Sequence, residues 1–289
     1  MILQFLGNGI VNGSLIAITA LGFSLVYNTT RVFHIAYAGI YVWAGYVLYV
    51  FMDYLHWPVI TSFLMAILAA ALLSVSCEAF LYAPLMRRGR SQNAIMISSV
   101  GMLILLVSLS ELFFGNVARY PDFSLSGTFL DNKLFFSGIR LISLLVCMTM
   151  LGLFFLFLNY SKMGIRIRAL RDDELLSRVF GIKTGRLKVF LFILSGVFVA
   201  TASGLSGLDV GINPHLGIPV FINAFVALVI GGIGRFDGPV LGGLLLGIIQ
   251  AMTEYFFDSR WVMMLTFILL LLFLLIRPKG LIPEKSRTF

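Results

Sequence analysis

The run Gly204-Leu205-Ser206-Gly207 has the G-x-S-G form used by one class of intramembrane serine protease. Such a serine acts as a nucleophile only when a histidine on another helix accepts its proton. The only histidine after Ser206 is His215, which lies close by in an expected loop. We therefore interpret the run as small residues that pack a helix, and we expect no catalytic residue in it.

A glycine-rich turn follows, from Gly231-Gly232-Ile233-Gly234 to Gly238. It resembles a phosphate cradle but lacks the G-K-[ST] ending with which a P-loop holds phosphates and Mg²⁺. The chain is therefore not expected to bind or hydrolyse ATP by itself. Its two cysteines lie in apolar runs and it has three histidines, so we expect no metal site and no cofactor.

Two acidic residues, Glu78 and Glu111, fall inside apolar segments, where ionisable groups are costly and often functional. Glu78 is followed by Arg87 and Arg88, and Glu111 lies near the outer end of its segment. Ion pairing or snorkelling explains both acids better than a proton relay does. Two single acids at opposite ends form no proton path, which argues against a proton-coupled secondary transporter.

The composition places these residues in a membrane. Of the 289 residues, 60% are hydrophobic and 12% are charged, and the mean hydropathy is +1.00. Soluble domains carry about a quarter charged residues, so a water-soluble globule is excluded. Several apolar runs reach the roughly 20 residues that cross a bilayer core. We predict an all-α fold, a polytopic transmembrane helical bundle that forms a single domain over 1–289.

Hydropathy and length place nine candidate spans, two of which are short. Residues 220–234 and 238–254 form either two tight spans or half-helices around the turn at 234–239, where Gly and Pro are concentrated. The chain is therefore expected to have eight or nine membrane spans. The nine segments are 2–27, 35–52, 58–86, 94–115, 139–160, 187–208, 220–234, 238–254 and 261–276.

The basic residues indicate the orientation of these spans. All but four of the 21 Lys and Arg residues fall in one alternate set of loops, which the positive-inside rule makes cytoplasmic. The C-terminus is therefore expected inside and, with nine spans, the N-terminus outside. The net charge of +8 is explained by these loops and does not indicate a nucleic-acid partner. The four exceptions are Arg119, Lys133, Arg140 and Arg260.

Two loops are long enough to suggest a function of their own. The external loop covers about 116–138, and the charged cytoplasmic loop covers about 160–188. Within the second, acidic residues at 172–174 suit a helix start and Gly181 suits a helix stop. The helix between them carries an apolar stripe. Because its start is acidic, we favour docking to a protein over lying on anionic lipid. The stripe consists of Leu175, Leu176, Val179 and Phe180.

Small residues recur every four positions in two places, at Gly196, Ala200 and Gly204 and again over 238–247. This spacing lets helix backbones approach closely in lipid. Packing within the bundle is the favoured interpretation, and a seam with a second subunit is the alternative. The glycines expected to pack helices are Gly196, Gly204, Gly231, Gly232, Gly242 and Gly243.

Four motifs occur in order along the chain. They are 22–27 with 31–36, which looks like G-x-x-L-V-Y…R-x-x-N-F-A; Glu78 with Tyr82, Pro84, Leu85 and Arg87; 224–243, which looks like A-F-V-A…G-G-x-G…G-G; and 277–281, which looks like R-P-x-G-L. Together they resemble the permease subunits of the high-affinity branched-chain amino acid ABC importers, over nearly the full length.

The resemblance implies a multi-pass protein of the inner membrane with no catalytic activity. Two homologous permease subunits would surround one path, with two cytoplasmic ABC ATPase subunits and an external solute-binding protein. The segment 169–182 matches the coupling region that fits a groove on the ATPase. The outer loops 116–138 and 208–219 would face the binding protein. The residues expected to couple to the ATPase are Arg171, Glu174, Leu175, Arg178, Phe180 and Gly181.

One motif departs from the family. Where the family usually has A-H-G-E or A-H-G-D, this chain has Ala36-Tyr37-Ala38-Gly39, which leaves the solute open. Because the spans carry few charges, we expect a small zwitterionic or neutral solute. The alternative function is a single-chain secondary transporter of such a solute. Four polar residues are candidates to line the path, although each could instead form an interhelical hydrogen bond: Asn12, Ser14, Tyr37 and Asn223.

Overall fold

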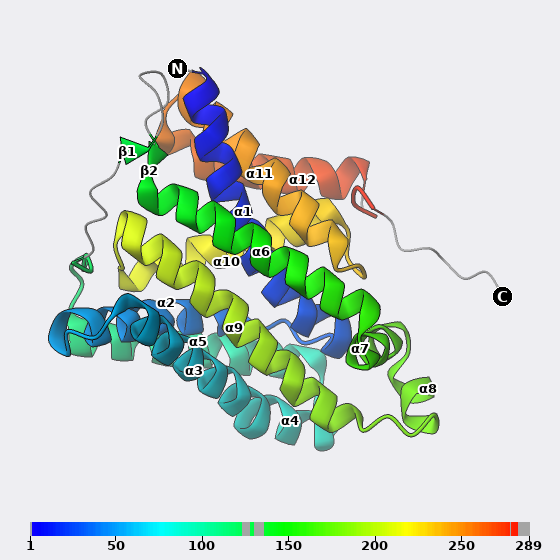
Figure 1. Cartoon of the computed structure of the whole chain (residues 1–289). Coiled ribbons are helices and arrows are strands. Elements are labelled where there is room, and N and C mark those ends of the chain that lie inside the picture. Colours follow the sequence, from blue (N-terminus) through cyan, green and yellow to red (C-terminus); the bar gives the residue numbers. More distant parts are fainter. Residues whose placement is uncertain (1, 123–127, 130–135, 278, 283–289) are drawn as a thin grey trace. The chain divides into compact units, whose positions relative to one another are not determined.

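The structure is a computed structural model that describes residues 2–122, 128–129, 136–277 and 279–282. It is almost entirely helical (Figure 1), so the predicted all-α fold is confirmed. The strands β1 (Thr128–Phe129) and β2 (Phe136–Ser137) form one short antiparallel pair. The α-helices are α1 (Ile2–Thr30), α2 (Tyr37–Tyr49), α3 (Val59–Ser76), α4 (Ala83–Arg87), α5 (Gln92–Phe114), α6 (Gly138–Tyr160), α7 (Lys162–Asp172), α8 (Glu174–Val179), α9 (Thr184–Val210), α10 (Gly217–Gly231), α11 (Asp237–Phe256) and α12 (Val262–Ile276).

Eight helices among the described residues are long and apolar enough to cross a membrane. The two short segments predicted at 220–234 and 238–254 correspond to two of these helices, which the turn at 232–236 separates. Each of the two is long enough to cross a membrane. The eight are Gln4–Thr30, Val59–Arg87, Gln92–Phe114, Gly138–Tyr160, Thr184–Val210, Pro214–Gly231, Asp237–Phe256 and Ser259–Ile276.

The span predicted at 35–52 is not among these eight. In its place α2 runs into the π-helical turn η1 (Val50–Tyr54), and most of α2 is buried. The segment is rich in tyrosine, whose hydroxyl groups lower its mean hydropathy, and Tyr37 and Tyr46 are 1% and 0% exposed. An internal helix packed on protein does not need a lipid-like sequence. The predicted outside position of the N-terminus depends on counting residues 35–52 as a ninth crossing.

The chain separates into two compact units, each built from segments that are discontinuous in sequence. Unit 1 comprises residues 1–24, 124–149 and 222–289, and unit 2 comprises 25–123 and 150–221. Three helices, α1, α6 and α10, contribute one end to each unit. The single permease domain remains a prediction.

In unit 1 the N-terminal part of α1 packs closely against α11. A Cβ atom on Gly243 would lie 2.6 Å from the Cα of Ala17, and a Cβ on Gly247 would meet the backbone of Gly13. The small residues on both helices therefore let the two backbones touch. Apolar side chains of α1, α10 and α11 complete the core of this unit, among them Ile16, Ala20, Ala224, Ala227 and Leu246.

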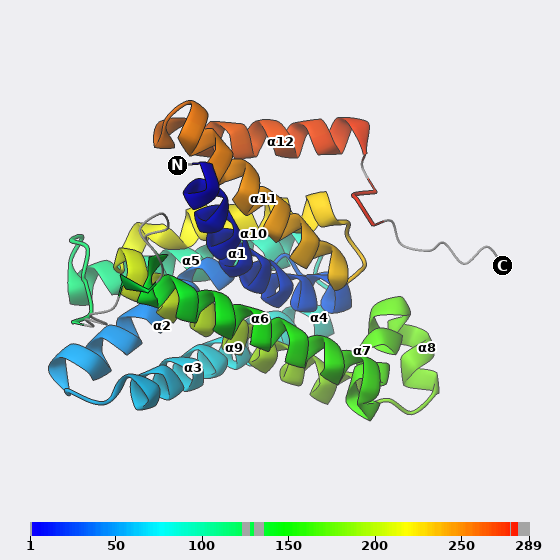
Figure 2. The ribbon, with the colours of Figure 1, turned by 45° about the horizontal axis from the view of Figure 1, so that its top comes forward.

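In unit 2 the helices α2, α3, α5 and α9 pack side by side, as both views show (Figures 1 and 2). A Cβ atom on Gly196 of α9 would lie 2.8 Å from the Cα of Ala71 on α3. One on Gly204 would lie 2.5 Å from the ring of Phe63. Because the residue numbers rise on α9 as they fall on α3, the two helices are antiparallel.

Candidate functional site

The charged segment between α6 and α9 folds into the short helices α7 and α8 (Figure 1). Asp173 begins α8, because its Oδ1 accepts a hydrogen bond from the backbone N–H of Leu176 at 3.0 Å. At the other end Gly181 has φ +78°, a conformation that glycine adopts without strain. There the N–H of Ile182 donates to the carbonyl of Ser177 at 3.0 Å. The helix thus lies between the residues that marked its start and stop in the sequence.

One side of α8 carries an exposed apolar face. The face comprises Leu175, Leu176, Val179 and Phe180, and these side chains are between 53% and 81% exposed. The opposite side contacts the protein through Ser177, which is 3% exposed. Apolar side chains grouped in this way gain about 25 cal/mol per Å² when they are covered. The α8 apolar face is therefore a surface that a partner protein or a bilayer could cover favourably.

Glu174, the first residue of α8, accepts hydrogen bonds from two cations. The Nζ atom of Lys188 on α9 lies 2.8 Å from its Oε1, and an Nη atom of Arg178 lies 2.5 Å from the same oxygen. Burial raises the pKa of Glu174, but the bonds from Lys188 and Arg178 outweigh burial, so this pKa is lowered overall. The remaining coupling candidate, Arg171, pairs with its neighbour Asp172 at 2.7 Å. Lys188 is the member of this cluster that the sequence did not indicate.

The four candidate path residues are divided between the units. Asn12, Ser14 and Asn223 belong to unit 1, and Tyr37 belongs to unit 2. Ser14 is fully buried and its hydroxyl donates to the carbonyl of Val11 on its own helix at 2.7 Å. Asn12 is exposed on α1, whereas Tyr37 is 1% exposed. Of these, Asn12 is placed where a solute or a partner can reach it.

Asn223 takes part in an interhelical hydrogen-bond chain in unit 1. Its Oδ1 accepts from the Nε2 of Gln250 on α11 at 3.1 Å, and the same Nε2 donates to the hydroxyl of Thr266 on α12 at 2.9 Å. Gln250 thereby bridges α10 and α12. This is the structural alternative that the sequence left open for Asn223.

The glycine-rich turn is filled by the chain itself. The N–H of Leu281 donates to the carbonyl of Ile230 at 2.8 Å, and the N–H of Ile282 donates to that of Gly231 at 3.1 Å. A Cβ atom on Gly232, where φ is +111°, would lie 2.7 Å from the carbonyl oxygen of Ile282. The turn thus holds the segment 279–282 and does not present an open cradle for a phosphate. Gly231 and Gly242 also lie against backbone, of Gly238 and Ala227 respectively.

Ser206 has the neighbours of a structural serine. The side chain of Tyr41 lies near it. His215 is directed elsewhere, because its Nε2 lies 3.6 Å from a carboxylate oxygen of Glu111. Ser206 and His215 therefore do not pair in this structure, and the interpretation of the run as packing remains a prediction.

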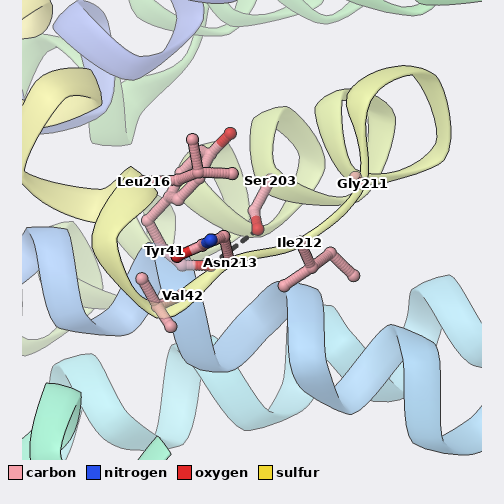
Figure 3. A pocket seen from close by; sticks show the side chains of 8 residues that line it. Tyr41, Val42, Ser203, Gly211, Ile212, Asn213 and Leu216 are labelled. Carbon is pink, nitrogen blue, oxygen red and sulfur yellow. Dashed lines mark hydrogen bonds between the residues drawn. The ribbon is translucent and has the colours of Figure 1, made fainter. Parts of the chain in front are cut away.

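A small cavity lies near the C-terminal end of α9 in unit 2 (Figure 3). The hydroxyl of Ser203 donates to the carbonyl of Tyr41 across it at 2.6 Å, and Asn213 accepts from the N–H of His215 at 2.9 Å. Its volume of about 10 Å³ is room for one water molecule. The cavity is therefore too small for an organic solute. Its lining residues are Tyr41, Val42, Ser203, Gly207, Gly211, Ile212, Asn213 and Leu216.

Comparisons with known proteins cover nearly the whole chain. The family described as branched-chain amino acid transport system / permease component matches residues 5–274. The chain is 30% identical over 302 residues to the high-affinity branched-chain amino acid transport system permease protein BraD of Pseudomonas aeruginosa, with 99% of this chain and 97% of that protein covered. It is also 30% identical over 310 residues to the corresponding protein LivH of Escherichia coli, with the same coverage.

Among solved structures, a chain of PsaBC from Streptococcus pneumoniae in complex with Fab is similar in fold. The TM-score is 0.55 at 16% sequence identity, and the match covers 96% of this chain and 93% of that chain. At this identity the similarity shows a shared fold and carries no argument about the solute.

Proposed function

Because the chain belongs to the family of branched-chain amino acid transport system permease components, we propose that it is the transmembrane permease subunit of an ABC importer that moves branched-chain or related amino acids. The relatives BraD and LivH are named as high-affinity permeases for branched-chain amino acids, and the match spans nearly all of each. The departure at Ala36–Gly39 leaves open which amino acid of this class the chain carries.

The observation that carries the proposal is the α8 apolar face. This exposed face sits on a capped helix in the loop that the basic residues assign to the cytoplasm. A rigid helix with an apolar side is suited to a groove on a partner. We assign that partner as a cytoplasmic ABC ATPase, which supplies the ATP hydrolysis that the permease itself lacks.

The remaining partners follow from the same assignment. Two ATPase subunits, a second homologous permease subunit and an external solute-binding protein complete the importer. The permease lies in the inner membrane as a multi-pass protein with its C-terminus in the cytoplasm. Eight apolar helices support the multi-pass arrangement, and the basic loops support its orientation.

Purification in mild detergent followed by reconstitution tests this function. A tagged chain should copurify with an ATPase and a second permease, identified by mass spectrometry. In liposomes, the complex and its binding protein should take up labelled leucine, isoleucine or valine only when ATP is enclosed on the ATPase side. Uptake by the chain alone without ATP would refute the proposal in favour of a single-chain secondary transporter.

A further inference from the structure

The register of α3 against α9 brings a buried acid and a buried lysine to the same level. Gly196 lies against Ala70 and Ala71, and Gly204 lies against Phe63. The step from Gly196 to Gly204 is eight residues, about 12 Å at 1.5 Å per residue, and the step from Ala70 or Ala71 to Phe63 is seven or eight. An equal step in the opposite direction leads from Gly196 to Lys188. On the other helix it leads to residues 77–79, the level of Glu78 in the π-helical turn η2 (Cys77–Tyr82) that continues α3.

Glu78 is buried without a complete set of hydrogen bonds. The residue is 4% exposed, and its Oε2 atom has no hydrogen-bond partner among the described residues. The charged groups near its carboxyl group are those of Lys188, Arg87 and Glu174. A buried carboxylate oxygen left unpaired is costly. Glu78 therefore offers an acceptor that is open to a nearby cation.

Lys188 is the cation near Glu78, but in this structure its ammonium group is bonded to Glu174 instead. Its side chain is 10% exposed, and its Nζ atom donates to Glu174 at 2.8 Å. Glu174 belongs to α8, whose buried contact with the protein is Ser177. Glu174 also holds Arg178, so it keeps an ion-pair partner when Lys188 leaves. Lys188 thus stands between one acid on α8 and a second acid on the span that α9 packs against.

We propose that Lys188 is a positioning residue that couples α8 to the α3–α9 pair by exchanging its ammonium group between Glu174 and Glu78. The inference rests on the proposed function, in which the ATPase moves α8. When α8 withdraws, the flexible lysine side chain turns its donors to the open oxygen of Glu78. The ammonium group of Lys188 is paired with a carboxylate in both arrangements and unpaired between them. Its side chain therefore has two stable positions.

Disulfide trapping measures the withdrawal of α8 from α9 on which the exchange depends. Cys77 and Cys147 are first replaced by alanine. Two variants then carry Lys188→Cys with either Glu174→Cys or Glu78→Cys, each in the complete complex in liposomes. We expect the first pair to cross-link about tenfold faster without nucleotide than with ATP and vanadate, because α8 withdraws. The second pair should cross-link at a rate that nucleotide leaves unchanged, because α3 and α9 keep their register. An unchanged rate for the first pair, or a nucleotide-dependent rate for the second, would overturn the exchange.

Uptake by a set of charge variants provides the functional test. Lys188→Met and Glu78→Gln should each lower ATP-driven uptake by about tenfold while the complex still assembles. The double variant should be no worse than either single one, and Lys188→Arg should restore uptake in part. Lys183→Met, at an exposed lysine of the same segment, is the matched control and should transport normally.

The outcomes separate this inference from the function on which it rests. If the parent takes up solute at full rate, two results would refute the exchange by Lys188 and leave the proposed function standing. One is normal uptake by Glu78→Gln, and the other is losses that multiply in the double variant. A parental complex that contains no ATPase and shows no ATP-driven uptake would refute the proposed function as well.

Discussion

Replacing Gly243 by alanine should force α1 and α11 apart. The new Cβ atom would lie 2.6 Å from both the Cα and the backbone nitrogen of Ala17, whereas ordinary Cβ contacts begin at 3.4 Å. The backbones must therefore separate by about 0.8 Å, because no side-chain rotation relieves a clash with backbone atoms. Overpacking of this kind costs about 1–3 kcal/mol. For a chain of this size the melting temperature should fall by about 2–12 °C.

Two buried cysteines provide the assay for Gly243→Ala. Cys77 and Cys147 are free and buried, so a dye that fluoresces on reaction with thiols reports unfolding of the detergent-solubilised protein on heating. Gly152→Ala is the matched control, since a Cβ atom there meets nothing within 4 Å and alanine favours helix by about 1 kcal/mol. Equal melting temperatures for Gly243→Ala and the parent would refute the argument from close backbone packing.

Three further predictions concern the polar and apolar contacts described above. Phe180→Asp should abolish most ATP-driven uptake in liposomes without lowering the melting temperature, because this side chain is 76% exposed; normal uptake would remove it from the docking surface. Because the pKa of Glu174 is lowered in the folded chain, its bond to Lys188 should hold above the ordinary Glu range. The protection of the α8 amides, relative to their intrinsic exchange rates at each pH, should then fall only as the pH falls from that range through the lowered value, and a loss of protection near neutral pH would contradict the assignment. Gln250→Leu should lower the melting temperature by roughly 1–3 °C, since membrane hydrogen bonds average about 0.6 kcal/mol, and a loss as large as that of Gly243→Ala would show a greater role for the bridge.

Features that depend on local chemistry could be predicted from the sequence. The start of α8 at Asp173 and its end before Gly181 follow from capping and from the backbone freedom of glycine, which neighbouring residues decide. The spans were predictable for a similar reason, because apolar length alone determines them. The exception is α2, which is only 13 residues long before the π-helical turn η1 follows it, although the apolar run in the sequence is longer.

Features that depend on helix pairing could not be predicted in the same way. The small residues at 243 and 247 indicate a close contact but not its partner, and the structure pairs them with α1 of the same chain. Likewise, ion pairing or snorkelling was expected of Glu78, and Arg87, which follows it in sequence, is indeed one of the charges near it. Its proximity to Lys188 becomes visible only through the register of α3 against α9. Sequence spacing within one helix carries no information about that register.

The π-helical turn η2 has a consequence for the comparison of homologous chains. The N–H of Ala83 donates to the carbonyl of Glu78, five residues back, so this turn holds one residue more than the α-helical turns around it. In evolutionary terms it is equivalent to a single inserted residue that the span absorbs without forming a loop. Homologues with a regular span are therefore expected to align with a one-residue gap within 77–82. Homologues that retain the turn should keep its length even where the residue types differ.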